Sequence, residues 1–285
     1  MTTTESTLPP ATPTAEFDQV VDTPAPKKFW TTKAIVGAVS SAAPTSTYSD
    51  SWGDIQDHAP CCSSVKFAHY ESVKRAWTDP STQSEFCNTA LKVGTSGGKT
   101  VDNMILVTFS MGNLVASGAV ASGVCNFGSG VTWVSIAGPM QGSKAANLLE
   151  EKCASGGWGA ALQGILGLIG YCPATPAYLN MKTQDSRAQQ GVHKVMCAVK
   201  SSGLVSTDAV ALSLVGRMAW NNDGTLHDGV VSFPSCSVGF GNFATDAEAG
   251  ANYKASVNHL DSSFRNGDGW WGADRKPVKW FECAL

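Results

Sequence analysis

MILVTFSMGNLVASGAVASGV, residues 104–124, is the stretch that decides how this chain is expected to fold. Its first part, Met104–Phe109, is a continuous apolar run of strand length, which is typical of a strand buried on both faces of a sheet. Residues 113–124 are small and apolar, and they are compatible with a closely packed helix. The stretch therefore predicts a strand, a sharp turn around Ser110 and a helix.

The same alternation continues on both sides of this stretch. We expect strands at residues 64–68 and 131–137, a helix at 83–93, a flexible turn at 94–98 and a helical segment at 191–199. Strands that alternate with helices favour a mostly parallel central sheet with helices on both faces. The predicted fold class is therefore α/β.

The composition suits one globular domain. Of the 285 residues, 43% are hydrophobic and 15% are charged, which is enough for one sizeable core. Residues 1–32 are predicted to be a disordered Thr/Pro-rich tail, and residues 33–285 the domain. Lys27 and Lys28 precede an apolar run at 34–43, which is far below the ~20 residues that span a bilayer. This apolar run therefore has two interpretations, a remnant of a membrane anchor and a first strand.

Charge and cysteine spacing exclude several classes of protein. The formal net charge is −3 and no basic cluster is visible, so a nucleic-acid partner is not expected. The 9 cysteines include no C-x-x-C pair, so nothing indicates a zinc or iron–sulfur site. They are spread along the chain as disulfides often are, which favours a secreted or membrane-associated protein. Buried free thiols would give the same distribution.

A segment that resembles a phosphate-binding loop lies at residues 94–100, GTSGGKT. The motif needs a glycine separated from its Gly-Lys pair by four residues, and that position is Val93. A phosphate-binding loop also follows a strand and opens a helix, whereas here a helix is expected before the segment and a strand after it. We therefore predict no nucleotide site.

The junction Thr108-Phe109-Ser110-Met111-Gly112 has the setting of a nucleophile elbow, whose usual form is G-x-S-x-G. The sharp turn requires small residues on both sides of the serine. Gly112 meets this requirement, whereas Thr108 replaces the first glycine and needs room for its hydroxyl. The N–H of Met111, at the start of the expected helix, would point at a developing oxyanion.

Four segments carry a resemblance to a known family. VTFSMGNLV at 107–115 resembles the elbow of lipases in the α/β-hydrolase superfamily. AGPMQGS at 137–143 is similar to the Pro-x-x-Gly-Ser segment of those lipases, DGVV at 228–231 to their acid loop, and VNHLD at 257–261 to their histidine segment. The resemblance covers roughly residues 60–265, and the order Ser, Asp, His is the one that this fold uses.

The resemblance implies Ser110 as nucleophile, His259 as general base and Asp228 as the acid that orients it. Asp223, in a second Asp-Gly turn of the same loop, stays open as an alternative acid, and Asp261 is expected to support or cap the histidine segment. The other histidines are set aside, because His58 and His69 precede the elbow, His227 adjoins Asp228 and His193 has no acid-loop neighbour.

The expected function is cleavage of a carboxylic ester, lipid or small molecule, through an acyl-enzyme and without a cofactor or metal. Two alternatives stay open: an impaired hydrolase-fold protein that binds an apolar ligand or a partner, and a thioesterase, acyltransferase or amidase with the same triad. Peripheral membrane contact and the oligomeric state are also open.

Two parts of the chain depart from the family pattern or allow two interpretations. The family has a His-Gly pair in the loop that supplies the second oxyanion donor, and residues 34–52 occupy that place without one. This leaves open whether the sheet is complete at its N-terminal end. Residues 156–170 carry an apolar stripe at helical spacing, which fits a buried core helix or a lid beside the active site.

Overall fold

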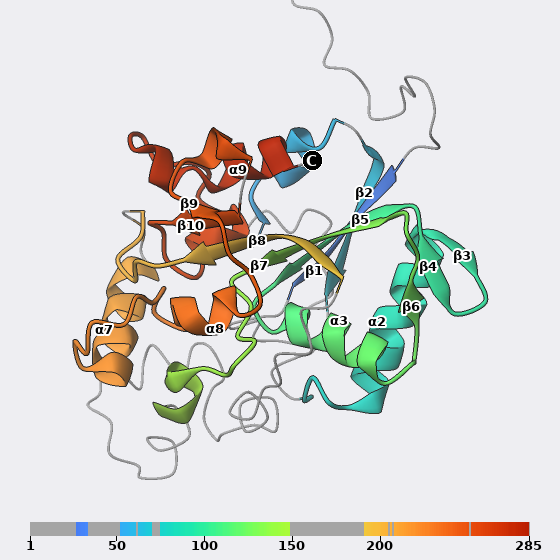
Figure 1. Cartoon of the computed structure of the whole chain (residues 1–285), viewed down its shortest axis with the longest axis horizontal. Helices are drawn as coiled ribbons and strands as arrows, with labels where there is room; N and C mark the ends of the chain where they lie inside the picture. The colour runs from blue at the N-terminus through green and yellow to red at the C-terminus, as the bar shows by residue number, and fades with distance from the viewer. Residues whose placement is uncertain are drawn as a thin grey trace, which may run out of the picture.

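The computed structural model describes residues 27–33, 52–60, 62–69, 75–148, 191–204, 206, 208–250 and 252–284. A 7-stranded sheet runs through the middle of these residues (Figure 1). In the order in which they pair, its strands are β2 (Cys62–His69), β1 (Lys27–Lys33), β5 (Met104–Phe109), β7 (Val131–Ile136), β8 (Val192–Ala198), β10 (Asn252–Ala255) and β9 (Phe243–Ala244). Every pairing within it is parallel.

Helices cover both faces of the sheet. Figure 1 shows α2 (Pro80–Val93), α3 (Gly112–Ala121) and α8 (Phe233–Ser237) on one side and α9 (Pro277–Ala284) on the other. The remaining described helices are α7 (Asp208–Trp220) and the short 3-10 turns η1 (Ile55–His58), η3 (Ala247–Ala249), η4 (Asp261–Ser263) and η5 (Ala273–Arg275). A parallel sheet covered in this way is the predicted α/β class.

The position of β5 in the middle of the sheet explains why its sequence is mostly apolar. Ile105, Val107 and Phe109 belong to the core cluster that includes α9. Met104 and Leu106 belong to the second cluster, beneath α2 and α3. Successive side chains of a strand point to opposite faces, so a strand covered on both sides favours apolar residues at every position, and Thr108 is the one polar residue of β5.

Two disulfides tie helices to neighbouring segments. Cys87 in α2 is bonded to Cys125, which follows α3, and this bond holds the two helices of one layer together. Cys197 in β8 is bonded to Cys236 in α8. These four cysteines are therefore not the buried free thiols that the sequence left open.

The prediction of a helix at 191–199 was wrong. Val192–Ala198 is strand β8, which lies between β7 and β10. A nine-residue segment has too few positions to separate helical from extended periodicity, and pairing with two flanking strands decides its conformation. Within the segment expected as a flexible turn, Thr95–Gly97 is strand β3, which pairs with β4 (Thr100–Asp102) in a small sheet completed by β6 (Asn126–Phe127).

The N-terminal boundary also differs from the expected one. Strand β1 spans Lys27–Lys33 and pairs with both β2 and β5, so the sheet includes residues that the sequence analysis placed in the tail. That the chain forms a single domain stays a prediction. Residues 156–170, interpreted above as a core helix or a lid, lie outside the described residues. Each helix of the described part of the chain is too short or too polar to cross a bilayer.

Candidate active site

Ser110 occupies the sharp turn between β5 and α3. Its φ is +52°, a left-handed conformation that residues other than glycine rarely adopt. Its backbone N–H donates to the carbonyl of Ile136 in β7 at 2.9 Å, which ties the turn to the neighbouring strand. The combination of a strained φ, a strand before it and a helix after it is the geometry of a nucleophile elbow.

Two buried side chains accommodate the hydroxyl of Thr108. It donates to the side-chain oxygen of Asn113 and accepts from the indole N–H of Trp133 at 2.8 Å. The Asn113 amide also donates to the carbonyls of Ser110 (2.9 Å) and Ile136 (3.0 Å). Thr108 is thus satisfied where most elbows have glycine, and Asn113, which the sequence analysis missed, holds the turn from within.

His259 connects Ser110 to Asp228. Its Nε2 lies 2.8 Å from Ser110 Oγ, and its Nδ1 lies 2.8 Å from Asp228 Oδ2. The exposed fractions of Ser110, His259 and Asp228 are 4%, 0% and 1%, so the chain of hydrogen bonds is shielded from bulk water. The ring of Phe109 packs against the imidazole at a centroid distance of 4.9 Å.

The loop around Asp228 holds its carboxylate in place. Asp228 Oδ1 accepts from the N–H groups of Val230 (2.8 Å) and Val231 (2.7 Å), which leaves Oδ2 for the histidine. Gly229 between them has φ +102°, and a Cβ there would lie 2.9 Å from Leu212. Only glycine fits this turn without strain or a clash.

Asp223 and His227 lie in the same loop but make other contacts. Asp223 forms an ion pair with Lys144 at 2.8 Å, and the hydrogen bond from Lys144 holds the pKa of that carboxyl well below its usual range. His227 stacks on Trp220 with ring centroids 4.3 Å apart, and burial lowers the pKa of its imidazole. Of the two candidate acids, it is Asp228 that contacts His259.

The histidine segment is fixed by a reciprocal pair of hydrogen bonds. The N–H of Asp261 donates to Asn258 Oδ1 at 2.8 Å, and the N–H of Asn258 donates to Asp261 Oδ2 at 3.2 Å. Asp261 also accepts from Leu204 N–H (2.7 Å) and from the Asn266 amide (2.7 Å). Burial raises the pKa of the Asp261 carboxyl despite these donors. Asn258 and Asp261 therefore clamp the turn that carries His259.

Comparison with solved structures finds the same architecture. The mature form of the lipase BlEst2 from Bacillus licheniformis matches with a TM-score of 0.57, at 17% identity over 87% of this chain and 92% of that one. Its propeptide form matches with a TM-score of 0.52, at 18% identity over 85% of this chain and 49% of that one. The chain has an α/β-hydrolase fold.

Sequence comparison alone finds no relative. No family model matches the chain, and no curated protein matches it in sequence. The α/β-hydrolase fold is therefore recognised from the arrangement of its strands and helices. At such low sequence identity, the similarity to the solved structures shows the fold and nothing further.

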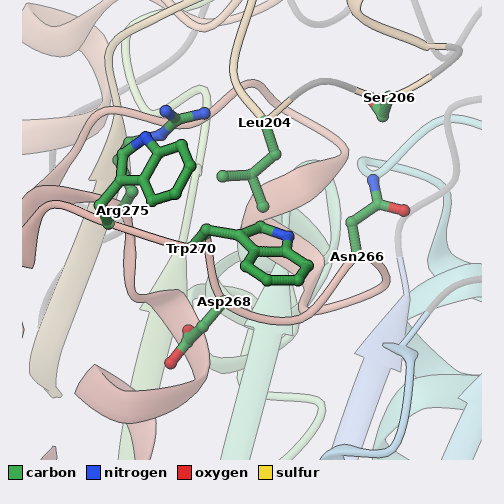
Figure 2. A pocket seen from close by; sticks show the side chains of 8 residues that line it. Leu204, Ser206, Asn266, Asp268, Trp270 and Arg275 are labelled. Carbon is green, nitrogen blue, oxygen red and sulfur yellow. The ribbon is translucent and has the colours of Figure 1, made fainter.

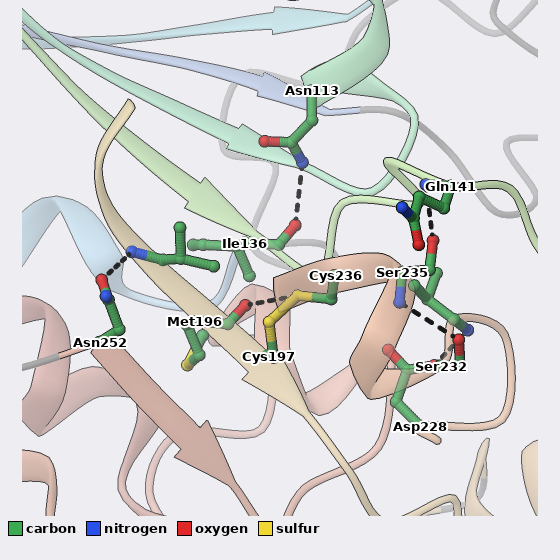
Figure 3. Close-up of a disulfide and its surroundings, with 12 residues drawn as sticks. Asn113, Ile136, Gln141, Met196, Cys197, Asp228, Ser232, Ser235, Cys236 and Asn252 are labelled. Carbon is green, nitrogen blue, oxygen red and sulfur yellow. Dashed lines mark hydrogen bonds between the residues drawn. A yellow bond between two sulfur atoms is a disulfide. The ribbon is translucent and has the colours of Figure 1, made fainter. Parts of the chain in front are cut away.

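In this hydrolase fold the segment after β7 is hydrogen-bonded to the loop that contains Asp228 and to α8. Ser143 donates to the carbonyl of Val230, and Ser235 in α8 accepts from the N–H of Gln141 at 2.9 Å while donating to the carbonyl of Gly142 at 2.8 Å. Figure 3 shows Gln141 and Ser235 in contact beside the Cys197–Cys236 disulfide, with Asp228 nearby. The resemblance pointed to residues 137–143, but not to Ser235.

The oxyanion side of the hydrolase fold is only partly described. Met111 follows Ser110 and is the N-cap residue of α3, at the helix N-terminus where backbone N–H groups have no acceptor within the helix. Lys33 at the end of β1 pairs with Phe109, so the chain leaves β1 beside the elbow. The next residues, 34–51, lie outside the described residues.

The histidines that the sequence analysis set aside lie elsewhere. His58 contacts Glu282 at 2.6 Å, and His193 Nδ1 accepts from the backbone N–H of Trp133 at 3.0 Å. His69 is the last residue of β2. His58 therefore makes a surface contact, whereas His193 links two neighbouring strands of the sheet.

Proposed function

We propose that this protein is a serine hydrolase that cleaves carboxylic esters, with Ser110 as nucleophile, His259 as general base and acid, and Asp228 as the residue that orients the histidine. The observation that carries the proposal is the continuous chain of hydrogen bonds from Ser110 Oγ through His259 to Asp228, each 2.8 Å long. It begins at a strained elbow, as nucleophilic catalysis by serine requires.

The first half of the reaction forms an ester between the acyl group and Ser110. Ser110 Oγ attacks the acyl carbon while His259 Nε2 accepts its proton, and the carbonyl oxygen becomes an oxyanion. The N–H of Met111 stabilises this oxyanion. As the carbon–oxygen bond to the alcohol breaks, His259 returns the proton to the leaving alkoxide.

The second half releases the acid and restores the enzyme. His259 accepts a proton from water, the hydroxide attacks the acyl carbon, and the bond to Ser110 Oγ breaks as His259 returns the proton to it. Asp228 accepts a hydrogen bond from Nδ1–H of His259 and so favours the tautomer whose unprotonated Nε2 faces the serine. The paired amides on Asp228 Oδ1 prevent the carboxylate from turning away.

The proposal is tested with a fluorophosphonate probe and p-nitrophenyl esters on the full-length protein. We expect the probe to label Ser110, and Ser110→Ala to lower kcat by roughly 10⁴-fold or more with an unchanged melting temperature. Ser122→Ala, at an exposed serine that follows α3, is the matched control and should retain activity. Folded protein that is neither labelled nor active would overturn the proposal and favour a binding protein.

Competition between acceptors then separates the related chemistries. Thioesters, amides and added alcohols should be poorer partners than oxygen esters and water if the protein is an esterase. A preference for thioester cleavage or for transfer to the alcohol would keep the roles of Ser110 and His259 but assign another reaction. The expected substrate is a lipid or small-molecule ester.

We further propose that the protein works in an oxidising compartment, at the cell surface or outside the cell. The two disulfides support this, because such bonds persist where thiols are not kept reduced. Mass measurement of alkylated protein, with and without reduction, tests the proposal, since protein isolated from its source should alkylate at Cys87, Cys125, Cys197 and Cys236 only after reduction.

A further inference from the structure

A pocket outside the Ser110 site lies between two segments that are distant in sequence. Its lining residues come from the turn after β8 and from the stretch between η4 and α9: Leu204, Ser206, Asn266, Asp268, Gly269, Trp270, Trp271 and Arg275. The pocket volume is about 580 Å³, within the range of sites for small ligands. Figure 2 shows the labelled side chains around it.

The pocket carries two adjacent tryptophans that face solvent. Trp270 is 91% exposed and Trp271 is 74% exposed, and their ring centroids lie 6.5 Å apart. Large aromatic rings are normally among the side chains that a protein covers, so an uncovered adjacent pair at the edge of a cavity indicates a binding surface. An exposed indole offers a flat apolar face to a flat partner.

Apart from Leu204 and Gly269, the rest of the wall is polar, and hydrogen bonds hold several of its side chains in place. Asp268 accepts from the N–H groups of Val278 and Lys279 at the start of α9, and Arg275 Nη2 donates to the carbonyl of Gly203 at 3.0 Å. Arg275 thereby joins the two segments that form the pocket. Asn266 is held by its hydrogen bond to Asp261 at 2.7 Å.

Two polar atoms in this wall lack a partner. Ser206 Oγ and Arg275 Nε are buried and have no hydrogen bond in the part of the chain that the structure describes. Buried polar groups are almost always paired, and an exception often indicates a water or ligand that is bound when the protein works. The wall therefore has hydrogen-bonding capacity that the described residues do not use.

We propose that this pocket binds a neutral sugar ring, as part of an oligosaccharide. A pyranose has an apolar face of C–H groups that stacks on an indole, and hydroxyls at its edge that both donate and accept. Trp270 matches the face, while Ser206, Asn266 and Arg275 match the edge. One acidic and one basic side chain, Asp268 and Arg275, line the same cavity, so neither an anion nor a cation is favoured.

The pocket is separate from the proposed catalytic residues, and sugar binding does not depend on ester hydrolysis. Asp261 connects the pocket to the histidine segment, because it accepts from Asn266 and from Leu204 N–H. A protein that binds sugar without cleaving esters, or the reverse, would separate the two proposals.

The test is a titration of the full-length protein with cellohexaose, maltohexaose and chitohexaose, followed by tryptophan fluorescence and calorimetry. We expect at least one of them to bind saturably and to shift the fluorescence. Trp270→Ala should weaken that binding by about five- to tenfold or more, because stacking on the indole is lost, and should leave p-nitrophenyl ester turnover unchanged. Ser110→Ala should bind as the wild type does.

Ser206→Ala separates binding from folding. Removal of a buried hydroxyl without a partner should not lower the melting temperature, but should weaken sugar binding measurably. Val210→Ala, at another exposed apolar residue (75%), is the control and should bind normally. The proposal is overturned if none of the three sugars binds, if Trp270→Ala leaves their affinity unchanged, or if only phosphatidylcholine vesicles or inorganic phosphate shift the fluorescence.

Discussion

Two Asp-Gly turns five residues apart, 223–224 and 228–229, share this dipeptide but lie in entirely different surroundings. The carboxyl of Asp223 reaches an exposed lysine, whereas that of Asp228 is buried against two amides and an imidazole. The turn motif supplies the bend in both cases. What separates the two aspartates is the segment that packs against each turn, and the variants below test whether that difference decides their roles.

Replacement of the two aspartates is expected to give the largest difference, which is measured in kcat. Asp228→Asn should lower kcat for p-nitrophenyl esters by roughly 10⁴-fold, because an amide at Oδ2 no longer favours the histidine tautomer that faces Ser110. Asp223→Asn should leave kcat within about twofold, since a surface ion pair contributes little. Steady-state kinetics of both variants makes the comparison, and equal losses would show that the two turns act together.

The glycines of the two turns give the second test. Gly229→Ala should lower the free energy of unfolding by about 3–5 kcal/mol, because φ is +102° and the new Cβ meets Leu212. Gly224→Ala should cost only about 1–2 kcal/mol, because φ is +84° but no atom lies within 4 Å. Urea unfolding of the two variants measures the difference, and similar midpoints would contradict it.

The smallest expected effect concerns pH and Lys144. The pKa of Asp223 is lowered in the folded protein, so its contribution to stability is present above the ordinary pKa of an aspartate and is lost only in strong acid. Lys144→Met should raise the pKa of Asp223 toward its usual value, as measured by NMR titration, with little change in melting temperature at neutral pH. An unchanged pKa would show that the turn, and not the lysine, sets it.

Local sequence predicted the elbow because every requirement of that turn lies within a few residues of Ser110. A buried strand, a small residue at Gly112 and a small-residue helix are all visible in one stretch. The placement of Thr108 could not be predicted in the same way. Its hydroxyl is accommodated by Trp133, 25 residues further along, which no local pattern reveals.

The conformation of β8 and the proposed sugar pocket also depend on contacts that local sequence does not reveal. Val192–Ala198 is a strand because two neighbouring strands pair with it, although its own spacing was interpreted as helical. The pocket brings Leu204 and Ser206 beside residues 266–275, and the contact that joins them is between Arg275 and Gly203, 72 residues apart.

By itself, the sequence determined the α/β class and the strand, turn and helix around Ser110, because apolar periodicity and turn chemistry are local properties of the chain. The order of the proposed serine, acid and histidine came from the resemblance to lipases. Only the tertiary structure decided which aspartate meets His259 and how Thr108 is tolerated. It also decided that Trp270 and Trp271 stand at the edge of a cavity. These depend on contacts between segments tens of residues apart, and burial rather than local pattern determines how such contacts affect charge and hydrogen bonding.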